Sequence, residues 1–436
     1  NELAEKSISL PYKNISFWIA IFIFLTVTAF LSGLYPAFYL SSFGPVKALK
    51  GSPRLGKSTA LSRRILVVMQ VTVSIVLIIG TIVVYQQIRY AQERPVGYDR
   101  EGLLQISNDA DFEKNKWVMK EELLAAGAAD YVAFSSSPVT AIWDNWGGFT
   151  WKGKNPDAES NFTLTLVDED YGKTIQWNLL QGRDFSRDFG TDRDAVIINR
   201  AAANYLQLEN PVGEFITQRS NNQQRQIIGV VDDVVMASPY EPVRPGFYWL
   251  EKNSPDYLGQ MLIRLPSGVS VGDALEKIKS KQNEVAPSSP FVYSFVDEEY
   301  DKKFKSEQRI GKLAFVFAIM AILLSCLGLF GLASFIAEQK TKEIGVRKVV
   351  GASIFNIWSL LSKEFIALVL ISFVMAIPVA YYYLHRWLST YNYHTDINPL
   401  VFIYAGGGVL VITLLTVSFH SIKAAIANPV KSLRSE

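Results

Sequence analysis

The chain has 436 residues, enough for about two or three domains, and 49% of the residues are hydrophobic and 13% aromatic. This apolar content is high for a purely soluble protein, so membrane segments are the first feature to expect. The single cysteine, Cys326, excludes an internal disulfide, a cysteine metal cluster and a redox pair, and three scattered histidines do not indicate a metal site.

Five stretches are long and apolar enough to cross a lipid bilayer, which takes about 20 helical residues. They are Phe17 to Leu40, Ile65 to Tyr85, Leu313 to Ile336, Phe365 to Leu384 and Leu400 to Phe419. Buried core helices are the alternative, but these stretches are apolar on all faces and are flanked by charged and aromatic residues. We therefore predict a membrane protein with five α-helical transmembrane spans, one plus four.

Charge is divided unevenly between the spans and the region from 89 to 309. That region holds 25 Lys and Arg against 34 Asp and Glu, a net charge of −9 that leaves +11 for the rest of the chain. Positive residues in short loops favour the cytoplasmic side of a membrane. The basic segments are 41 to 64, 338 to 358 and the C-terminal tail. We therefore place these segments inside, and 89 to 309 and the connection from 385 to 398 outside.

A short motif occurs twice. Pro45 to Lys50 reads P-V-K-A-L-K and Pro429 to Arg434 reads P-V-K-S-L-R, and the sequences around them align without gaps directly after a predicted span. Chance similarity between two cytoplasmic membrane exits is one interpretation and duplication is the other. On duplication, 1 to 52 is the end of a first half and the rest is a second half with four spans. Because the chain starts at Asn1, we expect an upstream portion to be missing.

Residues Gly51 to Ser58 match the phosphate-binding pattern G-x-x-x-x-G-K-[ST]. A phosphate loop needs a buried strand before it and a helix N-terminus inside an α/β domain. Here the preceding residues are polar and basic, and Ile65 begins a span seven residues after Ser58. We interpret 53 to 64 as a basic cytoplasmic linker and expect no nucleotide or other cofactor to bind there.

The outside region from 89 to 309 has the mixed pattern of an α+β domain. Strands are predicted at Phe162 to Val167, Ala195 to Ile198, Gln226 to Val231, Met261 to Leu265 and Phe291 to Phe295. Helices are predicted at Lys114 to Leu124, Arg200 to Leu206 and Val271 to Val285. The stretches Gln86 to Glu93 and Lys302 to Lys312 extend the adjacent spans, so we expect two helical stalks.

The segment Glu338 to Ser353 follows a span on the predicted inner side. Its apolar residues alternate with charges at near-helical spacing, which is typical of a short amphipathic helix at the membrane face. These apolar residues are Ile344, Val346, Val349 and Val350. Composition alone leaves two interpretations open, an anchor on the lipid surface and a docking surface for a cytoplasmic partner.

The order of residues in this segment, E-I-G-V-R-K-V-V-G-A, closely resembles the cytoplasmic loop motif of the FtsX/MacB-like ABC transporter permease family. The outside region carries four motifs similar to the MacB-like periplasmic core domain. They are L-Q-G-R-D-F (180 to 185), A-V-I-I-N (195 to 199), N-P-V-G (210 to 213) and I-G-V-V-D-D (228 to 233). The resemblance implies a transmembrane span at 65 to 88, a periplasmic core domain at 89 to 309 and an FtsX-like permease domain with three spans at 310 to 436. It also places the chain in a bacterial inner membrane.

The resemblance further implies that 338 to 353 is a coupling helix that docks on a separate cytoplasmic ABC ATPase. The residues assigned to it are Lys342, Glu343, Ile344, Gly345, Val346, Arg347, Lys348 and Gly351. ATP hydrolysis then belongs to the partner, the chain is no enzyme, and its periplasmic domain handles an amphipathic drug, peptide or lipoprotein. The alternative is a membrane-anchored sensor or scaffold that does not export. Expected partners are the ATPase, membrane lipids and periplasmic or outer-membrane envelope proteins, with no nucleic acid, metal or cofactor.

The remaining polar and small residues predict structural roles. Asp232 with Asp233 and the acidic run 297 to 299 lack a histidine or a nucleophile, so we interpret them as solvated faces rather than catalytic sites. Glycines are expected where a turn or a close approach of the backbone is needed, and small residues in a span where helices pack closely. These positions are Gly182, Gly213 and Gly229 in the outside domain and Gly328, Gly331, Ala333 and Ser334 in a span.

Overall fold

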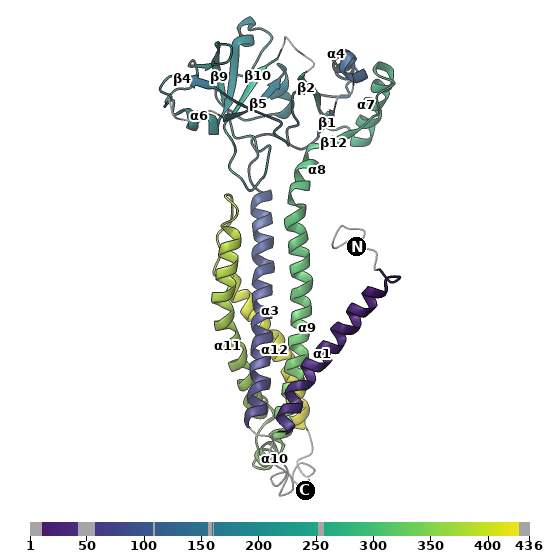
Figure 1. The fold of residues 1–436 in the computed structure, drawn as a ribbon, viewed down its shortest axis with the longest axis vertical. Coiled ribbons are helices and arrows are strands. Elements are labelled where there is room, and N and C mark those ends of the chain that lie inside the picture. The colour runs from purple at the N-terminus through teal and green to yellow at the C-terminus, as the bar shows by residue number, and fades with distance from the viewer. Residues whose placement is uncertain are drawn as a thin grey trace. The chain divides into compact units, whose positions relative to one another are not determined.

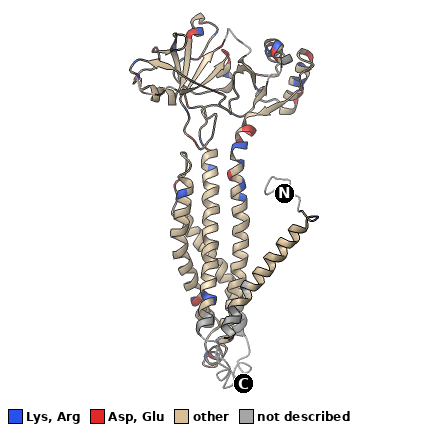
Figure 2. Ribbon diagram, in the orientation of Figure 1, with Lys and Arg blue, Asp and Glu red and all other residues tan. Residues whose placement is uncertain are grey.

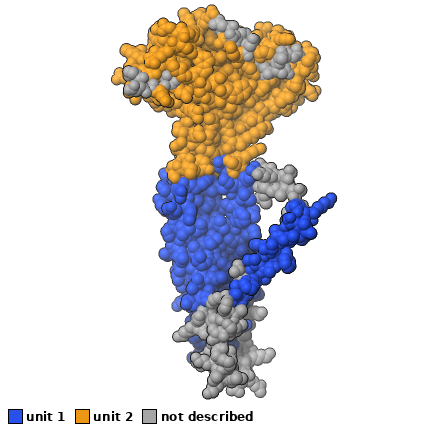
Figure 3. Space-filling model, viewed as in Figure 1, with its two compact units in different colours: residues 1–85, 307–387, 396–436 blue, residues 86–306, 388–395 orange. Residues whose placement is uncertain are grey.

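A computed structural model describes residues 11–41, 57–107, 110–155, 159, 161–251 and 257–426. The chain forms two compact units (Figure 3). The helical unit consists of Asn1–Tyr85, Glu307–Trp387 and Asp396–Glu436, and the sheet unit consists of Gln86–Ser306 and Leu388–Thr395. The chain therefore passes between the two units four times.

Long apolar helices make up the helical unit (Figure 1). They are α1 (Ile15–Ser41), α3 (Lys57–Gln92), α9 (Lys305–Gln339), α11 (Ile354–Leu388) and α12 (Leu400–Ile426), with the short α10 (Thr341–Val349) between α9 and α11. Within the described residues, four helical segments are long and apolar enough to cross a membrane. They are Leu61–Gln92, Val296–Gln339, Ile354–Leu388 and Leu400–Phe419.

Four of the five predicted spans are thus confirmed as parts of longer helices. The first predicted span, Phe17 to Leu40, lies within the 27-residue helix α1, but most side chains of α1 beyond Phe30 lie outside the described part of the chain. The count of five spans therefore stays a prediction.

The predicted linker from 53 to 64 is only partly correct. Residues 57 to 64 form the first turns of α3, and 53 to 56 lie outside the described residues. The helix begins early because Lys57 to Arg64 contains no proline or glycine, and Ala60 and Leu61 favour a helix. The basic residues Arg63 and Arg64 thus project from the end of a membrane helix.

The helix predicted from 338 to 353 is also shorter in the structure. Glu338 and Gln339 complete α9, Lys340 forms a junction, and α10 runs from Thr341 to Val349. Gly351 ends it with φ of +97°, while its amide donates to the Lys348 carbonyl and the Ala352 amide donates to the Arg347 carbonyl. These two bonds are the paired C-terminal cap that a left-handed glycine allows.

The sheet unit contains a 12-stranded sheet whose main path runs β12-β1-β11-β2-β5-β10-β7-β9-β8-β4, with β3 on β5 and β6 on β9 (Figure 1). The strands are β1 (Leu103–Ser107), β2 (Tyr131–Ser135), β3 (Asp144–Gly147), β4 (Phe149–Trp151), β5 (Asn161–Val167), β6 (Leu179–Gly182), β7 (Ala195–Asn199), β8 (Phe215–Gln218), β9 (Gln223–Val231), β10 (Gly246–Leu250), β11 (Gln260–Arg264) and β12 (Tyr293–Phe295). The helices are α4 (Ala110–Ala125), α5 (Tyr171–Ile175), α6 (Arg200–Leu206), α7 (Val271–Val285) and α8 (Val296–Asp301), with 3-10 turns η1 (Gly190–Asp194) and η3 (Lys302–Phe304).

This sheet has two lobes with separate cores. The first lobe, β12-β1-β11-β2, packs against α4 and α7 around residues such as Phe134 and Met261. The second lobe, from β5 to β4, packs against α6, and the rings of Phe162 and Phe247 stack there at 4.1 Å. Strands β2 and β5 join the lobes through one residue pair, Ser135 and Val167. The α+β prediction is confirmed, and a narrow seam divides the domain.

Candidate functional site

Helix α10 turns different residues inward and outward. Ile344 is 5% exposed and Gly345 is buried, whereas Val346, Val349 and Val350 are 53%, 66% and 82% exposed. Three exposed valines within five residues form an apolar surface that a soluble monomer rarely leaves uncovered. We call Val346, Val349 and Val350 the valine face.

The charged residues of α10 border this face. The Arg347 guanidinium lies 2.7 Å from the Glu343 carboxylate, an i,i+4 pair in which both side chains are about half exposed. Such a pair contributes only about 0.3–0.5 kcal/mol to a helix. The side chain of Lys342 is not described, and Lys348 lies in the last turn. Of the predicted coupling residues, Ile344 and Gly345 are therefore buried within the helical unit. Glu343, Val346 and Arg347 face outward.

A cluster of three charged residues lies beside the start of α10. Glu364 of α11 accepts from Arg64 of α3 at 2.7 Å and from Lys340, the junction before α10, at 2.5 Å. Its side chain is 28% exposed, so water screens both pairs in part. We call Arg64, Lys340 and Glu364 the ionic anchor. The partners of Glu364 are 300 and 24 residues away, so no local pattern in the sequence indicates this cluster.

Small hydroxyls connect the long helices further along. The Ser74 and Ser325 hydroxyls lie 2.9 Å apart between α3 and α9, and the Ser372 hydroxyl of α11 donates to the Val68 carbonyl of α3 at 3.1 Å. Gly328 allows a close approach, because a Cβ added there would lie 2.5 Å from Gln70 Oε1, while Gly331 has open space around it. Close packing between spans is thus observed at Gly328, while the prediction for Gly331, which allowed packing between subunits as well, stays a prediction.

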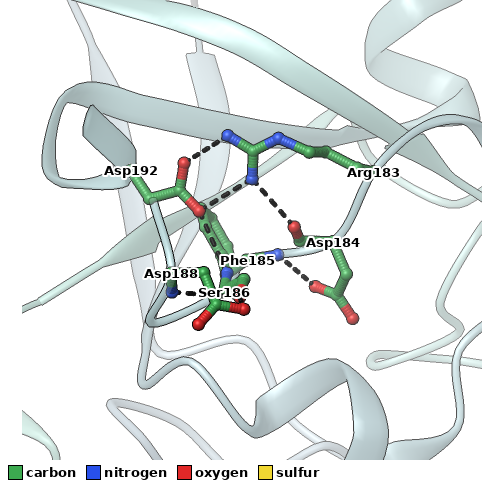
Figure 4. Close-up of polar contacts among 6 residues, drawn as sticks. All are labelled: Arg183, Asp184, Phe185, Ser186, Asp188 and Asp192. Carbon is green, nitrogen blue, oxygen red and sulfur yellow. Dashed lines mark hydrogen bonds and ion pairs between the residues drawn. The ribbon is translucent and has the colours of Figure 1, made fainter. Parts of the chain in front are cut away.

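The L-Q-G-R-D-F motif of the sheet unit forms a closed polar cluster (Figure 4). Arg183 donates to both carboxylate oxygens of the fully buried Asp192, at 2.8 and 2.5 Å, and these bonds raise the pKa of Arg183. Asp192 also accepts from the Ser186 amide at 3.0 Å. Asp184 accepts from the Phe185 amide at 2.7 Å, and burial raises its pKa. The cluster is satisfied by its own turn, which supports a structural role.

The acidic residues 232 and 233 cap a helix. Asp233 accepts from the Ala201 amide at 2.8 Å, Asp232 lies 3.1 Å from the Arg200 guanidinium, and burial raises the pKa of Asp233. Negative charge at this position suits the first turn of α6. The acidic run 297 to 299 lies in the first turn of α8. No group of three or more metal-ligating side chains occurs in the part of the chain that the structure describes.

The phosphate-loop match falls mostly outside the described residues. Gly51 to Gly56 are not described, and Lys57 and Ser58 begin α3, a helix of 36 residues. This long apolar helix differs from the helix of an α/β nucleotide domain. The interpretation of the match as fortuitous stays a prediction.

Two family models match the chain. The MacB-like periplasmic core domain matches residues 65–281, and the FtsX-like permease C-terminal model matches residues 315–429. The chain belongs to the FtsX/MacB-like permease family. The two matches are consistent with an ABC transporter permease. Members of this family work with a cytoplasmic ABC ATPase and are typically non-catalytic membrane subunits. Its apolar helices and the periplasmic domain fit a multi-pass inner-membrane protein.

Solved structures resemble part of the permease. The periplasmic region of MacB from Actinobacillus actinomycetemcomitans is 16% identical and covers 49% of this chain and 96% of its own, with a TM-score of 0.35. The extracellular domain of the noncanonic ABC-type transporter YknZ from Gram-positive bacteria is 15% identical and covers 44% and 96%, with a TM-score of 0.31. A domain of a permease protein from Porphyromonas gingivalis is 10% identical and covers 43% and 86%, with a TM-score of 0.31. No curated protein sequence matched the chain.

Proposed function

We propose that the permease couples ATP hydrolysis by a separate cytoplasmic ATPase to movements of its periplasmic domain, and that α10 is the docking helix. The valine face carries this proposal. A helix that only anchored the protein on lipid would bury its valines in the membrane and spread its charges around the opposite side. Here the Glu343–Arg347 pair borders valines that no described residue of the chain covers. A groove of the partner would receive such a helix as an apolar anchor with a polar rim.

The ionic anchor gives this helix a route to the spans. Lys340 precedes α10 by one residue, and Glu364 joins it to α11 while Arg64 joins Glu364 to α3. A displacement of α10 therefore acts on three long helices at one point. Each exposed pair contributes about 1 kcal/mol or less to stability, so the anchor can rearrange at little cost.

Transmission of movement is favoured over conduction through the bilayer. Charged side chains in the described parts of α3, α9, α11 and α12 lie toward the helix ends, and the middles carry apolar residues and hydroxyls (Figure 2). Pathways for polar substrates are usually marked by charged residues inside the membrane. We therefore propose that the cargo is amphipathic, a drug, a peptide or a lipoprotein, and is handled at the periplasmic domain.

Substitution in the valine face tests the proposal. Val346→Asp with Val349→Asp places two carboxylates in the contact, and losing even about 1.4 kcal/mol of binding lowers affinity tenfold. We expect the ATPase that co-purifies with the wild-type permease in mild detergent to be lost from this variant. A second variant exchanges Glu343 and Arg347 at the rim of the docking surface, keeps the valines, and should lose less of the ATPase than the valine variant. Undiminished co-purification with the valine variant would show that α10 is not the docking helix.

A further inference from the structure

One loop of the sheet unit, Met236 to Glu241, contacts every segment through which the chain passes between the two units. We call it the joint loop. It lies five residues beyond β9, in a stretch without regular secondary structure. The four crossings occur after Tyr85, Ser306, Trp387 and Thr395. The contacts described next all lie within the sheet unit.

The first crossing continues as the end of α3 and then reaches Arg94. The Arg94 guanidinium donates to two carbonyls of the joint loop, those of Pro239 at 2.7 Å and Glu241 at 2.8 Å. The backbone adds a second tie, because the Val235 amide donates to the Val96 carbonyl at 3.0 Å. The stalk that leaves α3 is therefore held to the joint loop by side-chain hydrogen bonds and to the residue directly before the loop by a main-chain hydrogen bond.

The second crossing is reached through η3, directly before α9. Lys303 in η3 donates to the Met236 and Ala237 carbonyls of the joint loop, each at 2.5 Å, and to the Thr140 carbonyl at 2.5 Å. An ammonium group has three donors, and these carbonyls use all three. The ring of Phe304 lies edge-on to the ring of Tyr240 at 5.8 Å. A charge and a buried aromatic ring thus bind the second stalk to the same loop.

The third and fourth crossings bracket the short segment Leu388–Thr395. Its Tyr393 amide donates to the Tyr240 carbonyl at 2.9 Å, and the Tyr391 ring lies 4.8 Å from the Tyr240 ring. The Tyr393 ring is also covered by the Arg94 guanidinium at 4.4 Å and stacks on the Tyr90 ring at 4.7 Å. The connection between α11 and α12 therefore meets the first stalk and the joint loop together.

The joint loop leads directly into the second lobe of the sheet. Asp232 and Asp233, which lie between β9 and the joint loop, cap α6 as described above. Strand β9 itself pairs with β6, β7 and β8. Lys303 also holds Thr140, which lies between β2 and β3, beside the seam of the two lobes. A shift of the joint loop therefore acts on the second lobe through α6 and β9. Through Lys303 it also acts on the segment that connects the two lobes.

We propose that the joint loop is the mechanical junction through which movements of the helical unit enter the periplasmic domain, with Lys303, Arg94 and Tyr393 as the residues that transmit them. This inference rests on the proposed function, because it assigns the place where ATP-driven movement arrives. The four crossings are spread along the chain from residue 85 to residue 395. The segments next to them nevertheless all contact the same six-residue loop. Hydrogen bonds to main-chain carbonyls make the loop follow the stalks whatever its own side chains are.

The test uses the full permease in nanodiscs with the ATPase that co-purifies with it. Hydrogen exchange is measured by mass spectrometry with and without ATP plus orthovanadate. In the wild type, nucleotide should change exchange in residues 232 to 241 and in α6. Arg94→Gln and Lys303→Met should each abolish this change while the ATPase still co-purifies. Arg89→Gln is the matched control, since Arg89 lies in the last turn of α3, five residues before Arg94, and pairs with the exposed Glu93 at 2.7 Å.

The outcomes separate the two proposals. If the ATPase co-purifies but Arg94→Gln keeps the wild-type exchange difference, the joint loop is not the junction. Arg94→Gln decides the question should Lys303→Met fail to fold, because it removes two side-chain hydrogen bonds to the loop. A wild-type complex with no nucleotide-dependent change in 232 to 241 overturns the inference as well. If no ATPase co-purifies with the wild type, the proposed function itself fails and the inference falls with it.

Discussion

The two units of the permease treat polar groups in opposite ways. In the sheet unit, the Lys120 amine lies 2.6 Å from Asp168 and 2.7 Å from Asp170, and the side chains of Lys120 and Asp168 are only 4% and 1% exposed. In the helical unit, the contacts between spans that lie deep in the bundle use hydroxyls, such as Ser74 with Ser325. Each choice follows from the solvent, because a charge costs more in lipid than in a domain surrounded by water.

This difference determines which unit can rearrange. A hydrogen bond between membrane helices contributes on average about 0.6 kcal/mol, whereas removing one member of a buried ion pair costs about 3–5 kcal/mol. The spans can therefore shift against one another at a small cost for each hydrogen bond broken. The two lobes of the sheet unit are joined by a buried pair that is expensive to break, so they resist moving apart.

The largest effect is expected at the buried pair across the seam. Lys120 projects from α4 of the first lobe, and Asp168 and Asp170 follow β5 of the second. Lys120→Met leaves the buried carboxylate of Asp168 without its cation, while Asp170 keeps Arg187 at 2.9 Å, and should lower the free energy of unfolding by about 3–5 kcal/mol. Urea unfolding followed by tryptophan fluorescence measures it. The control is Lys152→Met, whose pair with Glu214 is exposed and 3.6 Å long, and which should change stability by no more than about 1 kcal/mol. Equal effects would show that the seam pair is not stabilising.

The same pair predicts a dependence on pH. Burial raises the pKa of Asp168 from 3.8 to about 6, although Lys120 opposes the shift. Between about pH 4 and 6 the folded state then binds more protons than the unfolded state, so stability falls as pH rises, by on the order of 2–3 kcal/mol. Asp168→Asn removes this titration. The stability of the wild type relative to the variant should therefore decline from pH 4 to 6 and then level off. A difference that stays constant across this range would show that Asp168 titrates normally.

Local signals account for the elements that were predicted correctly. Helices α6 and α7 begin and end where the sequence predicts them, because Asn199 and Ser270 accept hydrogen bonds from the amides of Ala202 and Asp273 at their N-termini. Strand β10 was missed, although β7 and β11, whose five residues are also all buried, were predicted. A short apolar run alone does not distinguish a strand from a helix.

Contacts between distant residues account for what was missed. Arg64 and Glu364 are 300 residues apart, and Lys303 and Thr140 are 163 apart, so no spacing in the sequence relates them. The site on α10 stays a prediction, and it could be made from the sequence because its motif lies within one short helix. The ionic anchor and the joint loop depend on how helices and loops pack, and the sequence offered only their charges.

A smaller effect tests the packing of the spans. Gly328→Ala places a methyl group 2.5 Å from Gln70 Oε1, the end of a flexible side chain that can move aside. We expect a loss of about 1 kcal/mol in a membrane-unfolding titration with a denaturing detergent, at the low end of the range for overpacking. Gly331→Ala is the matched control in the same helix and should be neutral or slightly stabilising, because open space surrounds it and alanine favours a helix. If both substitutions cost the same, the close approach at Gly328 does not matter for stability.

The smallest effect on stability, and the most informative one for coupling, is expected at the ionic anchor. Glu364→Gln removes the charge that joins Arg64 to Lys340 but keeps the size of the side chain, so stability should change by no more than about 1 kcal/mol. The valine face is untouched, so the ATPase should still co-purify. The change in hydrogen exchange that nucleotide causes in the sheet unit should become smaller, because α10 then contacts α11 and α3 through packing alone.

Higher salt should also reduce this nucleotide-dependent change in the wild type, since it screens the partly exposed pairs. It should leave the change in Glu364→Gln as it is. A salt response of equal size in both proteins would mean that movement leaves α10 by another route.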